Sequence, residues 1–129
     1  MHPSYFEILN CSEHDVERSF SLSAEASEWL FHAKFWDAIN EELAANFGQY
    51  EDDTLPFAKV PAVLREFDRL EDSQFRDPNH SHKVIYAWSA EGENLESSVK
   101  SSDLKRDIDK LRSLLRRAIE RGSDVFCQL

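Results

Sequence analysis

Two histidines, His80 and His82, have the spacing in this sequence that most suggests chemistry. Alternate residues of an extended segment point to the same side, so the two imidazoles can share a metal ion. A stable zinc or iron site needs a third or fourth ligand, and nothing at regular spacing supplies one, although Asp72 or Asp77 can by folding back. The pattern therefore indicates a solvated polar loop first and a small metal-dependent enzyme second.

A cysteine and a histidine near the N-terminus, Cys11 and His14, suggest a thiol nucleophile activated by a neighbouring imidazole. This pair would lie across a hairpin turn, whereas catalytic partners usually converge from distant segments. The other cysteine, Cys127, lies in a short apolar segment that can neighbour that of Cys11 in a sheet. We expect two reduced thiols, with an oxidised Cys11–Cys127 pair as the alternative.

Adjacent carboxylates occur at Glu41-Glu42 and at Glu51-Asp52-Asp53. A general acid and base must face each other across a cleft, which neighbouring residues do not, and a calcium loop needs regular oxygen donors and a central glycine. With 3 glycines, the chain has no phosphate-cradling loop, and the serine-elbow and zinc-protease motifs are absent. The sequence thus predicts no catalytic residues and no cofactor.

The charge of the chain favours a basic partner. The formal net charge is −10, and residues 1–60 carry 12 acidic side chains against 3 basic ones. Nucleic-acid binding depends on lysine and arginine contacts to phosphate, so we expect no nucleic-acid partner. No apolar run reaches the length that crosses a bilayer, and the N-terminus lacks the layout of a signal peptide, so we expect a cytosolic protein without a membrane partner.

The elements that would position these residues follow from hydrophobic periodicity and turn signals. We expect one α+β domain over residues 1–129, with a small, mostly antiparallel sheet and about three helices packed on one face, in the order ββααβαβ. The expected elements are a hairpin of 5–9 and 16–22, a long helix between Ser23 and Gly48, an acidic loop at 49–55, a helix starting at Pro56 or Pro61, a strand at 83–88 in the centre of the sheet, a helix over 103–121 capped by Ser101 or Ser102, and a final strand at 125–127. Arg18 would place the second strand at an edge, and Trp29 and Trp36 belong to the core.

The last expected helix is cationic in an anionic protein. Residues 103–121 hold 7 basic and 4 acidic side chains. The bases either pair with acids of the first long helix or form a separate patch for a partner or a second subunit. The helix dipole accounts for Arg116, Arg117 and Arg121 near the C-terminal end, which favours an ordinary solvated face.

These observations together predict a non-enzymatic domain that binds a basic protein. The expected type is an immunity or antitoxin inhibitor that covers the cationic groove of a toxin such as a nuclease. An enzyme centred on His80 and His82 and an assembly subunit that self-associates through the basic helix are the alternatives. The predicted contact residues, with Tyr50 as the aromatic anchor, are Glu41, Glu42, Tyr50, Glu51, Asp52 and Asp53.

Overall fold

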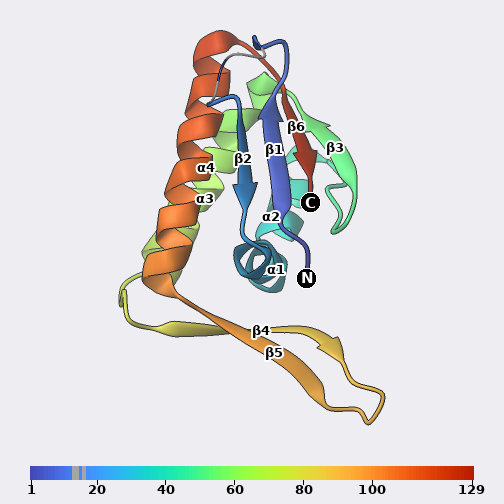
Figure 1. Ribbon diagram of the computed structural model, residues 1–129. Helices are drawn as coiled ribbons and strands as arrows, with labels where there is room; N and C mark the ends of the chain where they lie inside the picture. Colours follow the sequence, from blue (N-terminus) through green and yellow to red (C-terminus); the bar gives the residue numbers. More distant parts are fainter. Residues whose placement is uncertain (13–14, 16) are drawn as a thin grey trace.

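The chain folds around a four-stranded antiparallel sheet with the strand order β2-β1-β6-β3 (Figure 1). The computed structural model describes residues 1–12, 15 and 17–129. The strands are β1 (Ser4–Ile8), β2 (Ser19–Leu22), β3 (Asp52–Leu55) and β6 (Val125–Gln128). The first and last strands pair in the centre of the sheet, which brings the two termini of the chain together (Figure 1).

Helices cover one face of the sheet, as the α+β expectation required. The helices are α1 (Ala24–His32), α2 (Phe35–Leu43), α3 (Val60–Gln74) and α4 (Ser101–Arg121), and a short 3-10 turn, Phe57–Lys59, precedes α3. Phe6 and Ile8 of β1 are buried beneath the helices, whereas the alternate residues Tyr5 and Glu7 face the other side and are half-buried. The long helices α3 and α4 lie side by side (Figure 1).

Several local signals gave the correct structure. The N-terminal hairpin is present, its second strand lies at the sheet edge, and the Ser23 hydroxyl accepts a hydrogen bond from the backbone N–H of Ala26 at 3.2 Å, as an N-cap does. Gly122, with a φ of 60°, ends α4, and β6 returns to the sheet. Val16, at the start of the expected second strand, lies outside the described residues. Trp29 and Trp36 are buried in the core.

The expectation of one continuous helix from Ser23 to Gly48 is wrong. The chain breaks between α1 and α2 at Lys34, whose φ of 64° is left-handed, and α2 ends at Leu43 before a left-handed Ala44. The break turns α2 so that Phe35 packs on Phe67 of α3, with ring centroids 4.3 Å apart. The tertiary contacts of these large rings therefore override a pattern that is helical throughout.

The expectation of a central strand at 83–88 is also wrong. Within the described residues, β4 (Ser81–Trp88) pairs only with β5 (Asn94–Lys100), in a separate two-stranded hairpin that extends away from the main body (Figure 1). We call residues 81–100 the arm. The composition of β4 is typical of a buried strand. The inner half of the arm does cover α1, but its outer half is uncovered.

Residues 52–55 were expected to be loop and instead form an edge strand. Asp52 to Leu55 pair with β6 on one side only. Acidic residues are poor strand formers, so the pairing depends on the neighbouring strand and on the burial of Leu55.

The expectation that Ser101 or Ser102 caps α4 is likewise wrong, because Lys100 occupies the N-cap position of this helix. No helix in the described ranges is both long and apolar enough to cross a bilayer.

Candidate binding surface

The exposed edge of the sheet carries the predicted acidic residues. We call Tyr50, Glu51, Asp52 and Asp53 the acidic edge; all four are exposed. Asp52 pairs with Gln128 and Asp53 with Cys127 of β6, which fixes both residues on a rigid strand. In the part of the chain that the structure describes, Glu51, Asp52 and Asp53 have no ion-pair partner. Their charge is therefore available to an outside group.

The backbone of β3 is also open on its outer side. The backbone N–H of Leu129 donates to the carbonyl oxygen of Glu51 at 3.0 Å, so this residue faces β6. Antiparallel ladders alternate, and the N–H and C=O groups of Asp52 and Thr54 therefore point outward. The Thr54 N–H donates to the Asp53 carboxylate at 2.7 Å, which satisfies one of these outward groups from within the strand. An extended segment of another protein can pair with such an edge.

Tyr50, the first residue of the acidic edge, has a strained backbone conformation and a ring that packs on His2. Its φ of 64° is left-handed, its ring contacts the His2 ring edge-on with centroids 5.3 Å apart, and 57% of the residue is exposed. It lines a surface hollow of about 340 Å³ with His2, Pro3, Gln128 and Leu129. Partial burial, and secondarily the charge of Glu28, raises the pKa of Tyr50, so the phenol stays a hydrogen-bond donor.

Glu41 and Glu42, the remaining predicted contact residues, lie elsewhere on the surface. They line a hollow between α2 and α3 with Ala38, Glu66 and Arg69, which has no residue in common with the hollow at Tyr50. Glu42 also forms an ion pair with Arg65 of α3 at 3.4 Å. The structure thus groups four of the six predicted residues and places the other two at a second position.

Most bases of α4 are neutralised within the molecule, but not by the acids that the sequence suggested. Their partners lie on α3, on α4 itself and before β2. The pairs are Arg112 with Asp68, Glu71 and Asp109, Lys105 with Glu71 and Asp109, Arg106 with Asp103, Arg117 with Glu17, and Arg121 with Asp15. Among the described residues, Lys110 and Arg116 are the α4 bases without an ion pair. Pairing with the long helix at 24–47 is therefore wrong for the described chain.

The two histidines lie at the base of the arm. The rings of His80 and His82 meet edge-on with centroids 4.7 Å apart, and His82 is buried against Trp29, 5.0 Å away. Nε2 of His82 lies 2.7 Å from the Ser101 hydroxyl oxygen. In the described ranges, no three His, Cys, Asp or Glu side chains come together to hold a metal. Ser101 is 1% exposed, so a substrate cannot reach this His–Ser pair.

The cysteines are free and do not neighbour each other in the sheet. Cys127 pairs with Phe6 and Asp53, whereas Cys11 follows β1 and accepts a contact from the Arg121 guanidinium at 2.9 Å. His14, the expected catalytic partner of Cys11, lies outside the described residues. The oxidised Cys11–Cys127 alternative is therefore not the state of this structure.

The sequence reasoning missed the arm as an exposed element. Trp88, near its tip, is 67% exposed, more than any other large apolar residue described. The signal that was present is the turn at Glu91-Gly92-Glu93-Asn94 between two segments of similar length.

Comparison of the chain with protein-family models, curated proteins and solved structures finds no match.

Proposed function

We propose that this domain binds a basic protein partner through the acidic edge and acts without catalysis. The proposed type is an inhibitor of the immunity or antitoxin class, which covers the cationic substrate groove of a toxin such as a nuclease. Inhibition of this type is steric, since a bound domain excludes the polyanionic substrate from the groove.

The observation that carries the proposal is the combination of free charge and free backbone on β3. Asp52 and Asp53 on β3, and Glu51 directly before it, are exposed without ion pairs in the described chain, and the strand offers outward N–H and C=O groups. Strand addition supplies backbone hydrogen bonds, while the carboxylates select a partner strand or loop rich in lysine and arginine. The same carboxylates repel a second acidic edge, which protects the open strand from self-pairing.

Tyr50 supplies the part of the interface that charge does not. Interface affinity is concentrated in a few aromatic and arginine residues within a desolvated centre. The Tyr50 ring is exposed beside the carboxylates, and the His2 ring restrains it. We infer that the phenol packs on the partner and donates a hydrogen bond, while the surrounding acids raise the association rate.

The test is affinity capture from a lysate of the source organism at low salt, with three forms of the immobilised domain. The first is wild type, and the second carries Glu51→Lys, Asp52→Lys and Asp53→Lys. The control carries Asp37→Lys, Asp72→Lys and Glu120→Lys, which are exposed acids on α2, α3 and α4, and so has the same net charge as the second form.

The proposal expects one basic protein, captured stoichiometrically by wild type and control and released as salt rises. Recovery by the acidic-edge variant should fall at least about tenfold, which corresponds to roughly 1.4 kcal/mol. Adding the domain to the captured protein should also block its action on its polyanionic substrate. Equal capture by the acidic-edge variant and the control would show that this edge is not the binding surface.

A further inference from the structure

The arm is held to the body only at its inner half. His82 and Val84 are buried, and the His32 ring nitrogen Nε2 lies 2.6 Å from the carbonyl oxygen of Ile85 on β4. Beyond Ile85 the register shifts by a bulge before Ala87, and the outer half extends from the body (Figure 1). A two-stranded hairpin is marginally stable in water by itself, so an uncovered outer half gains stability from any surface that covers it.

The tip of the arm combines exposed apolar side chains with two carboxylates. Trp88 is 67% and Leu95 39% exposed, and Glu91 and Glu93 between them are exposed, with no ion-pair partner in the described chain. The turn is ordered by its own hydrogen bonds, since the Ser89 backbone N–H donates to the Glu93 carbonyl oxygen at 2.7 Å. The tip is thus a preorganised acidic and aromatic surface.

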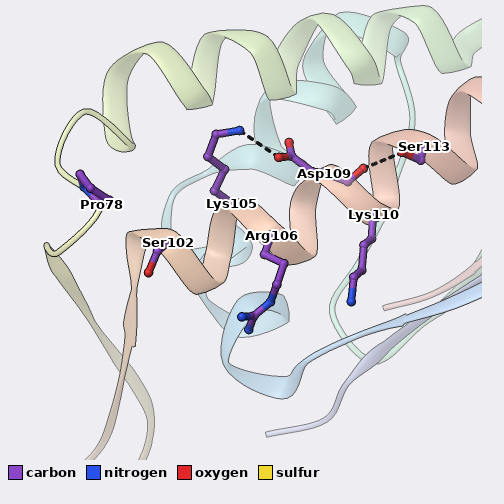
Figure 2. A pocket seen from close by; sticks show the side chains of 7 residues that line it. All are labelled: Pro78, Ser102, Lys105, Arg106, Asp109, Lys110 and Ser113. Atoms are coloured by element: carbon purple, nitrogen blue, oxygen red, sulfur yellow. Dashed lines mark hydrogen bonds and ion pairs between the residues drawn. The ribbon is translucent and has the colours of Figure 1, made fainter.

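A surface of the opposite charge lies on α4 of the same chain. Arg106 and Lys110, which we call the cationic stripe, extend to the same side of the helix, whereas Lys105 is turned away toward Asp109 (Figure 2). They line a hollow of about 520 Å³ together with Pro78, Ser102, Lys105, Asp109 and Ser113. Arg106 pairs only with Asp103 of its own helix, at 3.2 Å, and Lys110 has no ion pair in the described chain. An exposed pair of this kind is weak and easily exchanged.

We propose that the occupant of the cationic stripe is the arm of a second copy of this chain, in a reciprocal two-fold dimer. Glu91 and Glu93 of each arm contact Arg106 and Lys110 of the other protomer, and Trp88 packs over the hollow beside them. Two-fold symmetry makes both contacts at once, because each protomer carries one arm and one stripe.

The dimensions and charges of the chain support this occupant. A strand of 8 residues such as β4 spans about 26 Å, and a helix of 21 residues such as α4 spans about 31 Å, so the arm can reach along a partner's helix. The net charge of −10 opposes association of two copies, and the cationic stripe is a place where an acidic tip meets attraction instead. The acidic edge lies on β3 and on the two residues before it and takes no part in this contact, so the dimer is independent of the basic partner proposed above.

The test is the molar mass of the full chain across a concentration series, by sedimentation or light scattering. Wild type should pass from monomer to dimer as concentration rises. The arm variant Glu91→Lys/Glu93→Lys and the stripe variant Arg106→Glu/Lys110→Glu should each weaken dimerisation at least about tenfold, because each places like charges opposite one another. All four positions are exposed, and circular dichroism checks that both variants stay folded.

An equimolar mixture of the two variants provides the decisive readout. The reversed arm then meets the reversed stripe, and the native arm meets the native stripe. The mixture should therefore form a heterodimer at concentrations at which each variant alone is still a monomer. Acrylamide quenching gives a second readout, because Trp29 and Trp36 are buried and the accessible emission belongs to Trp88. Quenching of wild type should decrease as dimer forms. A wild-type chain that stays monomeric at every concentration, or a mixture that stays monomeric, would overturn the proposal.

Discussion

The ring nitrogen Nε2 of His82 lies 2.7 Å from the hydroxyl oxygen of Ser101, at the point where the arm joins α4. The imidazole is 8% exposed and packs against the rings of Trp29 and Phe75, at centroid distances of 5.0 and 6.2 Å. Burial, and secondarily the charge of His80, lowers the pKa of His82 below its ordinary value. Burial therefore favours the neutral form of this ring in the folded protein.

Protonation of His82 should destabilise the fold under mildly acidic conditions. The ring binds a proton near pH 6.5 in the unfolded chain and only at lower pH in the folded protein. The contribution of neutral His82 to the free energy of unfolding is therefore complete above about pH 6.5 and is lost as the pH falls toward the lowered pKa of the folded state. Urea unfolding between pH 7.5 and about 5.5 should show decreasing stability in wild type and a smaller decrease in His82→Gln. His2→Gln, at an exposed histidine that contacts Tyr50 and not His82, is the control, and an equal pH dependence in wild type and His82→Gln would contradict this account.

The ion pairs of Arg112 should matter more when a carboxylate is lost than when the arginine is lost. The Arg112 side chain is 10% exposed, contacts Asp68 and Glu71, and its Nε has no hydrogen-bond partner in the described chain. Asp68→Asn with Glu71→Gln leaves a buried cation with only the longer contact to Asp109, at 3.9 Å, and should cost about 3 kcal/mol. Arg112→Met keeps the packing and should cost about 1 kcal/mol or less. Urea unfolding ranks the two variants; the reverse order would show that the pair is net stabilising.

Relief of backbone strain at Lys34 should stabilise the protein. This residue has a φ of 64° between α1 and α2, a conformation that costs a side-chain-bearing residue about 1–2 kcal/mol. Lys34→Gly should raise the free energy of unfolding by about 0.5–1 kcal/mol, since part of the gain is offset by the greater freedom of glycine in the unfolded chain. Thermal unfolding compares the variants. Lys34→Gly should raise the thermal midpoint, whereas Lys34→Ala, which removes the same side chain and keeps the strain, should not.

The two cysteines should differ sharply in reactivity toward a thiol reagent. Cys127 is fully buried, and burial, followed by the charge of Asp53, raises its pKa to about 12. Cys11 is half-buried near the N-terminus. Mass spectrometry of the native protein at about pH 8 should show one modification, absent in Cys11→Ser, and two after unfolding. Equal labelling of both thiols in the native protein would contradict the burial of β6.

Signals that act within a few residues predicted the structure well. The Ser23 cap, the Gly122 stop, the helical stripe of 103–121 and the hairpin at the N-terminus depend on local geometry, and the fold retains each of them. The helix break at Lys34 could not be read in this way. It results from the packing of Phe35 on Phe67, 32 positions away in the sequence, which no local pattern reveals.

Sheet neighbours were the least predictable part. The segment Val84 to Trp88 has a composition typical of a central strand and lies in the arm, whereas Asp52 and Asp53 have the composition of a loop and form an edge strand. Charge and an aromatic neighbour predict six contact residues, and the structure places four of them at one edge of the sheet. The sequence does not reveal that Glu41 and Glu42 lie away from that edge, because their position depends on the direction in which α2 leaves the break at Lys34.

The central claim is that the acidic edge binds a basic protein, and amide hydrogen exchange of the captured complex tests it most directly. The outward N–H group of Asp52 should exchange much more slowly in the complex than in the free domain, together with the backbone around Tyr50. Protection there, with no change along the arm or α4, is the result that the account predicts. Protection confined to other elements, with unchanged exchange at residues 50–54, would contradict it.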